Sequence, residues 1–317
     1  MTITRKLPVE VEREASGAFD ARLNALDLPL TPEELQRALQ ESDGLICTVS
    51  DRLDALALGR DPLRCRILAN YGVGFNHIDL TAARALGITV TNTPDVLTNA
   101  TADLAILLMQ LLARRAGEGE RLVRSGAWAG WRPTQLLGTD LDGKTLGIVG
   151  MGRIGREVAR RAGMMWKMEV VYHSRSAMSE THDSRLTTRR VELDELMRAA
   201  DVVSLHVPAM PETRHLIDAR RLRLMKPTAF LVNTARGDVV DEQALVAALK
   251  GGQIAGAGLD VYEREPTVSP ELLGMENVVL LPHLGSATRE TRVAMGMRAL
   301  ENLREFFEGT PVPDLIR

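Results

Sequence analysis

Residues 145–162 have the sequence TLGIVGMGRIGREVARRA, and this stretch decides the fold of the chain. The apolar run 145–149 predicts a buried strand, and the pattern over 156–162 predicts a helix. Between them lies G-x-G-x-x-G, which binds dinucleotides when a strand precedes it and a helix follows it. Outside that context the same pattern often marks only a turn.

Each glycine of this pattern has a physical task. Gly150 allows a tight turn, Gly152 lets the backbone approach a pyrophosphate, and Gly155 lets the helix pack close to the strand. The free N–H groups and the dipole of the new helix then face the phosphates. The sequence therefore predicts a dinucleotide site formed by Gly150, Met151, Gly152, Arg153, Ile154 and Gly155.

The composition excludes several other classes of protein. The chain has 317 residues, enough for two domains, and its net charge of −3 argues against a nucleic-acid partner. Cys47 and Cys65 lie in apolar runs, so we expect buried thiols rather than a disulfide. The six histidines are scattered, and no metal is expected. Residues 1–14 are charged and no run has the length of a membrane span, so the expected compartment is the cytoplasm.

Short apolar runs alternate with helical patterns along the chain, which predicts parallel α/β sheets. Residues 99–112 are apolar almost all round, so we expect a deeply buried helix there. Residues 128–142 are irregular, and residues 287–308 are predicted to form an amphipathic helix. The predicted strands are 44–49, 66–70, 88–92, 145–149, 169–172, 201–205, 229–233, 256–260 and 277–281.

Three polar motifs follow predicted strands, where open α/β sheets place their ligands. They are NTARG at 233–237, DVYEREP at 260–266 and LPHLGSAT at 281–288. Each of these residues also has a structural interpretation when it is taken alone. Arg236 would then be a surface cation, Glu265 a solvated loop acid and His283 a structural histidine. Downstream of a nucleotide fingerprint, these three residue types are the groups that reduction of a 2-oxo acid requires.

This combination resembles the D-isomer-specific 2-hydroxyacid dehydrogenase family, most closely its glyoxylate/hydroxypyruvate reductase branch. The resemblance rests on the polar motifs together with NYGVGFNHID at 70–79, TNTPDVLT at 91–98 and GKTLGIVG at 143–150. It implies two doubly wound, parallel-sheet (Rossmann-like) α/β domains with the active site in the cleft between them. Residues 1–97 and 287–317 would form the outer substrate domain, and residues 98–286 the dinucleotide-binding domain.

In that family the catalytic groups correspond to Arg236, Glu265 and His283. Arg236 would hold the substrate carboxylate as a planar double donor and stabilise the developing oxyanion. His283 would contact the substrate as general acid, with Glu265 stabilising its imidazolium form. The N–H groups of Val73 and Gly74 would bind the other face of the carboxylate. The resemblance also implies cofactor contacts from Thr101, Val207, Pro208, Thr213, Thr234, Ala235, Arg236, Asp260, His283 and Gly285.

The choice of cofactor depends on the end of the second strand of the nucleotide domain. NAD-specific members place an acid there to hold the ribose 2′-OH, but here Glu169 starts the strand and lies too far back. Ser174, Arg175 and Ser176 follow the strand and suit a 2′-phosphate, which predicts that NADPH is preferred over NADH. In the alternative, Arg175 is a solvated loop residue and the enzyme accepts either NADP or NAD.

The favoured hypothesis is a reductase of glyoxylate or hydroxypyruvate that forms a homodimer through its nucleotide domain. Tyr71, Phe75 and Asn76 lie near the carboxylate loop without a cluster of cations, which disfavours a phosphorylated substrate. Trp131 is expected at an interface or in packing. In the alternative that the resemblance implies, it reaches the partner subunit's site and has a minor substrate role. One rival is a non-catalytic, nucleotide-sensing corepressor on the same fold. The other is oxidation of an inorganic or one-carbon acid, such as formate or phosphite. The resemblance disfavours formate, because formate enzymes of that family lack the glutamate that Glu265 supplies.

Overall fold

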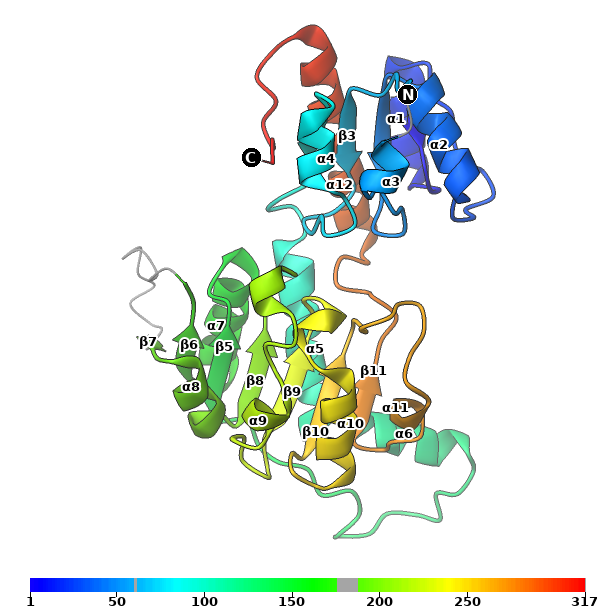
Figure 1. The fold of residues 1–317 in the computed structure, drawn as a ribbon. Coiled ribbons are helices and arrows are strands. Elements are labelled where there is room, and N and C mark those ends of the chain that lie inside the picture. Colours follow the sequence, from blue (N-terminus) through cyan, green and yellow to red (C-terminus); the bar gives the residue numbers. More distant parts are fainter. Residues whose placement is uncertain (60–61, 176–187, 317) are drawn as a thin grey trace. The chain divides into compact units, whose positions relative to one another are not determined.

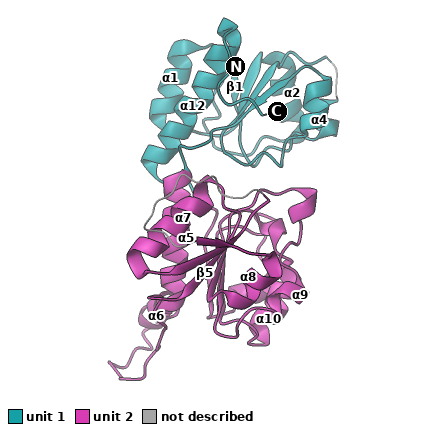
Figure 2. Ribbon diagram, turned by 90° about the vertical axis from the view of Figure 1, so that its left-hand side faces the viewer, with its two compact units in different colours: residues 1–97, 286–317 teal, residues 98–285 magenta. Residues whose placement is uncertain are grey.

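A computed structural model describes residues 1–59, 62–175 and 188–316 of the chain (Figure 1). The chain divides into two compact units, which Figure 2 colours separately. Unit 1 comprises Met1–Leu97 and Ser286–Arg317, and unit 2 comprises Thr98–Gly285. Each unit has its own parallel sheet with flanking helices, so the Rossmann-like α/β architecture predicted from the sequence is confirmed.

Unit 1 is a parallel sheet covered by helices. Its elements are β1 (Thr2–Ile3), α1 (Val9–Ala18), α2 (Pro32–Glu41), β2 (Gly44–Cys47), α3 (Ala55–Leu58), β3 (Ile67–Asn70), α4 (Leu80–Ala85), β4 (Thr89–Thr91) and α12 (Arg289–Glu308). The strand order is β1-β2-β3-β4, and a parallel bridge between Thr2 and Arg22 continues the pairing beyond β1. The chain therefore pairs on one side of β1 before it crosses to β2 on the other side, as in doubly wound sheets.

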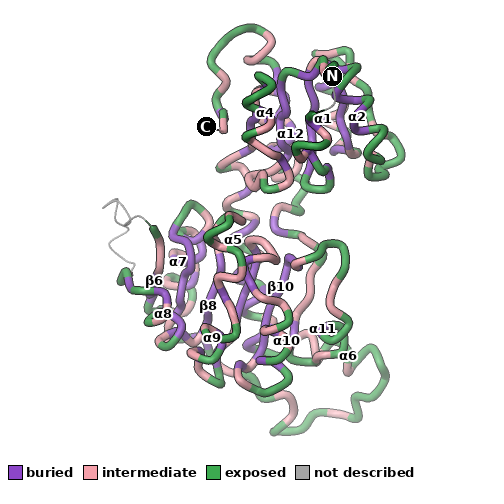
Figure 3. The backbone as a smooth tube through the Cα atoms, viewed as in Figure 1, coloured by how far each residue is buried: buried purple, intermediate pink, exposed green. Residues whose placement is uncertain are grey.

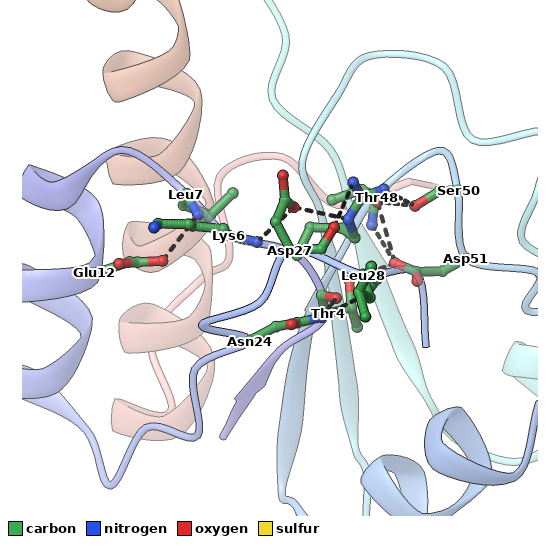
Figure 4. A network of polar contacts seen from close by, with 11 residues as sticks. Thr4, Lys6, Leu7, Glu12, Asn24, Asp27, Leu28, Thr48, Ser50 and Asp51 are labelled. Carbon is green, nitrogen blue, oxygen red and sulfur yellow. Dashed lines mark hydrogen bonds and ion pairs between the residues drawn. The ribbon is translucent and has the colours of Figure 1, made fainter. Parts of the chain in front are cut away.

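A polar network ties the segment after β2 to the segment after β1 (Figure 4). The carboxylate of Asp51 is buried and accepts hydrogen bonds from Thr4 Oγ1 and, at 2.7 Å, from the Thr48 N–H. Burial raises the pKa of Asp51, and these hydrogen bonds only partly oppose it. Two residues further on, the Leu53 N–H donates to His77 O at 2.9 Å. The network thus supports the loop that follows β3.

Unit 2 carries the larger sheet. Its elements are α5 (Thr98–Ala113), α6 (Ala116–Arg124), β5 (Thr145–Val149), α7 (Arg153–Trp166), β6 (Glu169–His173), β7 (Thr188–Arg190), α8 (Leu193–Ala199), β8 (Val202–Leu205), η1 (Pro211–Thr213), α9 (Ala219–Leu222), β9 (Phe230–Asn233), η2 (Gly237–Val239), α10 (Glu242–Lys250), β10 (Gly256–Leu259), α11 (Pro270–Leu273) and β11 (Val278–Leu280). The strand order is β11-β10-β9-β8-β5-β6-β7. The order reverses between β5 and β8, and this is the point where doubly wound sheets bind their ligands.

Helix α5 packs against the face of the unit 2 sheet formed by β9, β10 and β11, and against α7. A Cβ on Gly258 of β10 would lie 3.1 Å from Leu108 Cβ, so the glycine permits the close approach of helix and strand. The expectation that α5 is buried on all sides is wrong, because Leu107 remains 42% exposed and Asp103 and Gln110 are also exposed. Figure 3 shows the strands as the buried centre of each unit.

The predicted strands and the final helix agree with the observed elements to within two residues at their ends. Two strands, β1 and β7, were not predicted by the sequence analysis, which also assigned no ranges to most of the shorter helices. Cys47 and Cys65 are buried free thiols as expected, and burial raises the pKa of Cys65 to about 12. None of the described helices combines the length and apolarity that a membrane crossing needs.

Candidate active site

The glycine pattern lies in the turn between β5 and α7, as predicted. Gly150 has a φ of +99°, and a Cβ there would lie 2.6 Å from His206 O. A Cβ on Gly155 would lie 2.1 Å from Gly150 O. Both positions therefore require glycine, the first for the turn and the second for the packing of the helix on the strand.

The N-terminus of α7 can accept an anion. Gly152 is its N-cap and forms no side-chain cap hydrogen bond, and nothing lies within 4 Å of the position of a Cβ on Gly152. At the end of β9, on the same edge of the sheet, Thr234 Oγ1 is buried without a hydrogen-bond partner among the described residues. An open helix N-terminus and a strand-end hydroxyl on the same sheet edge fit a dinucleotide with its pyrophosphate on the helix.

Among the described residues, the tip of β6 carries donors and cations and no carboxylate. Ser174 is half-buried and Arg175 is exposed, while Glu169 pairs with Thr145 at the opposite end of the strand, which confirms that it lies too far back. Ser176 lies outside the described residues. Arg190, which the sequence analysis missed, donates to the carbonyl oxygens of Ser174 (2.8 Å) and Arg175 (3.1 Å). The sequence gives no signal for Arg190, because its strand β7 has the sequence TRR and no apolar pattern. The residue is found only from the pairing of β7 with β6 in the structure.

Other predicted cofactor residues lie on loops along the same edge of the unit 2 sheet. Val207 and Pro208 follow β8, and the Thr213 hydroxyl donates to Pro208 O at 2.6 Å, which closes the 208–213 loop. Thr101 on α5 donates to Gly285 O at 3.0 Å. The roles of these residues in cofactor binding stay predictions, since their hydroxyl groups are here engaged with the protein backbone.

The turn that carries Arg236 is organised by the buried side chain of Asn233. Its Nδ2 donates to Arg236 O at 2.9 Å, and its Oδ1 accepts from the Ala235 N–H at 3.0 Å. The Arg236 side chain is partly buried and Nη1 donates to Ala235 O at 2.6 Å. Burial lowers the pKa of Arg236, whereas the charges of Glu265 and Asp238 raise it. The guanidinium therefore stays charged in a partly dry environment, where it interacts strongly with an anion.

Glu265 and His283 form a hydrogen-bonded pair. Glu265 Oε2 lies 2.8 Å from His283 Nδ1, and each side chain is 32% exposed. The other oxygen, Oε1, accepts the Tyr262 N–H at 3.1 Å. Burial by itself raises the pKa of Glu265, but the hydrogen bond and charge of His283, with Tyr262 N–H and Arg236, lower it overall. The carboxylate therefore stays ionised and presents its charge to the ring of His283.

Asp260 fixes the backbone around His283. Its Oδ1 accepts the Leu284 N–H at 2.6 Å, its Oδ2 accepts the Gly285 N–H at 2.8 Å, and the His283 N–H donates to its carbonyl oxygen at 2.9 Å. His283 has a φ of +56°, which is uncommon for a residue other than glycine. Burial raises the pKa of Asp260, and the two N–H groups oppose this shift. Asp260 thus holds the histidine in a backbone conformation that the chain rarely adopts unaided.

In unit 1, the loop after β3 presents backbone N–H groups. Asn70 Nδ2 donates to Gly72 O and Gly74 O, each at 3.0 Å, and Asn92 Nδ2 donates to Val73 O at 2.9 Å. Within the described parts of the chain, no hydrogen bond uses the N–H of Val73 or Gly74. Side-chain amides thus hold the carbonyl groups and leave these two donors for an anion.

Tyr71 lies in the loop after β3, and its side chain is held within unit 1. Its side chain is buried, and its hydroxyl donates to Arg292 O at 2.6 Å within unit 1. Burial raises the pKa of Tyr71 to about 12. Tyr71 therefore anchors α12 to the loop, while Phe75 remains partly exposed and Asn76 exposed.

A dinucleotide turn followed by an arginine and a paired glutamate and histidine on the same sheet edge defines a nicotinamide-dependent dehydrogenase. A sequence model of the family described as "D-isomer specific 2-hydroxyacid dehydrogenase, NAD binding domain" matches residues 106–285. The glyoxylate reductase of Thermococcus onnurineus is 45% identical over 318 residues, covering 99% of this chain and 94% of that protein.

Solved structures agree with these sequence matches. A putative D-isomer specific 2-hydroxyacid dehydrogenase from Polaromonas superposes with a TM-score of 0.92 at 36% identity, covering 100% of this chain and 98% of that one. An NADPH-dependent glyoxylate/hydroxypyruvate reductase from Sinorhizobium meliloti, in complex with NADP and malonate, gives 0.87 at 34% identity, covering 99% and 95%. The chain belongs to the D-isomer specific 2-hydroxyacid dehydrogenase family. It is thus an enzyme that interconverts 2-oxo acids and 2-hydroxy acids, and the corepressor-like alternative is not favoured.

Proposed function

We propose that this enzyme reduces glyoxylate or hydroxypyruvate with NADPH as the preferred hydride donor. The observation that carries the proposal is the hydrogen bond between Glu265 and His283, on the same sheet edge as the partly buried Arg236. The match to glyoxylate reductases supports the choice of a small substrate. Residues 98–286 are proposed as the cofactor domain, and residues 1–97 with 287–317 as the substrate domain.

Three side chains and one loop divide the work. Arg236 binds the substrate carboxylate and stabilises charge that develops on the carbonyl oxygen. The N–H groups of Val73 and Gly74 are further donors for a carboxylate. A bound nicotinamide cofactor supplies the hydride. His283 then delivers a proton from Nε2, since its Nδ1 is held by Glu265. A negative charge beside the ring favours its protonated form.

The preference for NADPH rests on the tip of β6. Arg175 is exposed there, and Arg190 brings a second guanidinium to the same backbone segment. Two cations and the Ser174 side chain suit a dianionic 2′-phosphate, while the tip lacks the acid that would hold a ribose hydroxyl. NADH is expected to bind more weakly because it lacks the charged group.

We also propose a homodimer formed through unit 2. Trp128 and Trp131 are 51% and 80% exposed on the segment between α6 and β5, which extends away from the sheet (Figure 2). Met164 and Met165 on α7 are 58% and 53% exposed near α5. A second copy is expected to cover these apolar side chains. The cytoplasmic location stays a prediction.

A spectrophotometric assay tests the proposed activity. The purified enzyme is mixed with glyoxylate, hydroxypyruvate, pyruvate, formate or phosphite, each with NADPH or NADH or their oxidised forms. We expect the highest kcat/KM for glyoxylate or hydroxypyruvate with NADPH. Turnover of pyruvate above both, or a preference for NADH, would refute the corresponding part of the proposal.

A further inference from the structure

His215 makes hydrogen bonds to two segments of unit 2 that carry proposed catalytic residues. Its backbone N–H donates to Asp238 O at 2.7 Å, two residues after Arg236. Its ring Nε2 lies 2.9 Å from Glu263 Oε1, two residues before Glu265. One residue therefore connects the arginine turn to the glutamate loop, although the chain separates the two segments.

The two segments also touch directly. A Cβ on Gly237 would lie 1.9 Å from the carbonyl carbon of Tyr262 and 2.3 Å from Glu263 N, so the turn after Arg236 packs on this peptide. The Glu263 N–H donates to Glu242 Oε2 at 3.2 Å at the start of α10. A contact this close has little tolerance, and its geometry depends on the bonds that hold each side.

The backbone of His215 is itself fixed. Its φ is +48°. Two residues further on, the Ile217 N–H donates to Val239 O at 3.0 Å. Ile217 is fully buried in the core of unit 2. The ring is therefore aimed at Glu263 from a rigid base, and its side chain is only 34% exposed.

We propose that His215 is a positioning residue that sets the placement of Glu265 relative to Arg236 through its pair with Glu263. The inference rests on the proposed function of the site and adds a residue to it that contacts neither substrate nor cofactor. If the pair is lost, the 263–265 segment shifts, and Glu265 no longer lies at its present 2.8 Å from His283. A displacement of about 1 Å in a catalytic group can lower the rate by about 100-fold.

Other charged groups face the same carboxylate. Arg214 Nη2 lies 3.8 Å from Glu263 Oε1, beyond hydrogen-bonding distance, and its side chain is 62% exposed. Glu242 bonds the Glu263 backbone, not its carboxylate. Because Arg214 reaches the same oxygen from solvent, its removal changes charge at Glu263 without removing the short bond. It is the matched control for His215.

The experiment compares wild type with His215→Ala, His215→Gln, Glu263→Ala and Arg214→Ala. Glutamine keeps a donor at the position of Nε2, so His215→Gln should stay within about threefold of wild-type kcat, while His215→Ala falls about tenfold or more. Glu263→Ala removes the same hydrogen bond by deleting its other partner, and its kcat should fall by a similar factor. The double variant His215→Ala/Glu263→Ala should have the same kcat as either single variant, because both substitutions remove the same interaction. Arg214→Ala should match wild type.

A second measurement does not depend on turnover. The ring of His283 is followed through a pH titration by NMR, with its signals assigned from His283→Ala. In His215→Ala and Glu263→Ala the midpoint should move to lower pH, since a displaced Glu265 stabilises the imidazolium less. In His215→Gln and Arg214→Ala it should stay in place. Fluorescence titration should show NADPH binding unchanged in all four single variants.

The two measurements separate two kinds of failure. A wild type that reduces none of the oxo acids refutes the proposed function, while the NMR midpoints still test the positioning role. An unmoved His283 midpoint in both alanine variants overturns the inference, whatever the activity. So does His215→Gln behaving as His215→Ala, because the role would then not depend on the hydrogen bond. Should His215→Ala fail to fold, Glu263→Ala supplies the same comparison.

Discussion

Glu265 contacts His283 through one carboxylate oxygen and the Tyr262 N–H through the other. The first contact is 2.8 Å from Oε2 to Nδ1, and the second is 3.1 Å from the Tyr262 N–H to Oε1. The backbone bond fixes the orientation of the carboxylate, so the second oxygen is directed at the ring. The His283 Nε2 is left as the nitrogen that can exchange a proton with a substrate.

Replacing Glu265 with glutamine removes the charge and keeps the size of the side chain. Reduction of glyoxylate should fall as pH rises, because protonated His283 is consumed, and in Glu265→Gln this fall should occur at lower pH. The carboxylate acts over a wide range, since its pKa is held below the ordinary value of 4.5 and it stays charged at mildly acidic pH. The measurement is kcat/KM against pH for both proteins, with deuterated NADPH to show that hydride transfer limits the rate.

The low-pH plateau of this profile is the internal control, because His283 is protonated there in both proteins. His206 does not contribute to this pH dependence, since burial lowers its pKa to about 3 and it stays neutral. His283→Ala should lose most activity at every pH and show no such fall. A profile of Glu265→Gln that superposes on wild type after scaling would make Glu265 a structural loop acid.

Arg236 is predicted to bind the substrate as a planar fork. Arg236→Lys keeps the positive charge but replaces the fork by a single ammonium, and kcat/KM for glyoxylate should fall on the order of 100-fold or more. Binding of NADPH, measured by fluorescence, should be nearly unchanged. Turnover close to wild type in this variant would remove Arg236 from the site.

Arg175 is predicted to select NADPH. Arg175→Ala should raise the KM for NADPH by about 10- to 100-fold and leave NADH almost unaffected, because only the former carries the 2′-phosphate. Arg189→Ala is the matched control, since Arg189 lies beside Arg190 but pairs with Glu195 at 2.6 Å. Equal effects of Arg175→Ala on the two cofactors would show that it does not bind the phosphate.

The strands of both sheets could be predicted because most are short, buried and apolar, and because turns and polar motifs separate them. The run 145–149 became β5 without change, since the glycine turn ends it sharply. β7 escaped prediction because its residues are polar and partly exposed, and its strand character comes only from pairing with β6. The two residues of β1 are likewise too few to show a period.

The site divides in the same way. Arg236 and His283 follow predicted strands, so the sheet edge itself brings them to one place. The partners that orient them are separated by 24 residues for Asp260 and Leu284, and by 48 for His215 and Glu263. No local pattern encodes such pairs, because the hydrogen bonds exist only after the strands are assembled. The exposed face of α5 could have been predicted, because Asp103 and Gln110 are polar and lie with Leu107 on the exposed positions of the helix.

Asp260→Asn tests whether the carboxylate next to the histidine is kept for geometry at a cost in stability. The two oxygens of Asp260 accept the Leu284 and Gly285 N–H groups, at 2.6 Å and 2.8 Å. An asparagine can accept only one of them and turns an amide N–H toward the other, so the loop around His283 must shift. We expect kcat to fall about 10- to 100-fold with glyoxylate, and the His283 titration to move.

The difference in stability between wild type and Asp260→Asn should depend on pH in a defined direction. Burial raises the folded-state pKa of Asp260 above its ordinary value of 3.8, so between these two values the folded enzyme binds a proton that the unfolded chain has lost. The contribution of Asp260 to the free energy of unfolding is therefore full below pH 3.8 and declines as pH rises through the folded pKa. Asparagine does not titrate. The difference in unfolding free energy between wild type and Asp260→Asn, measured by urea denaturation at several pH values, should thus decrease from acid toward neutral pH. A difference that grows with pH would mean that the two N–H groups outweigh burial and that the ionised form of Asp260 stabilises the fold.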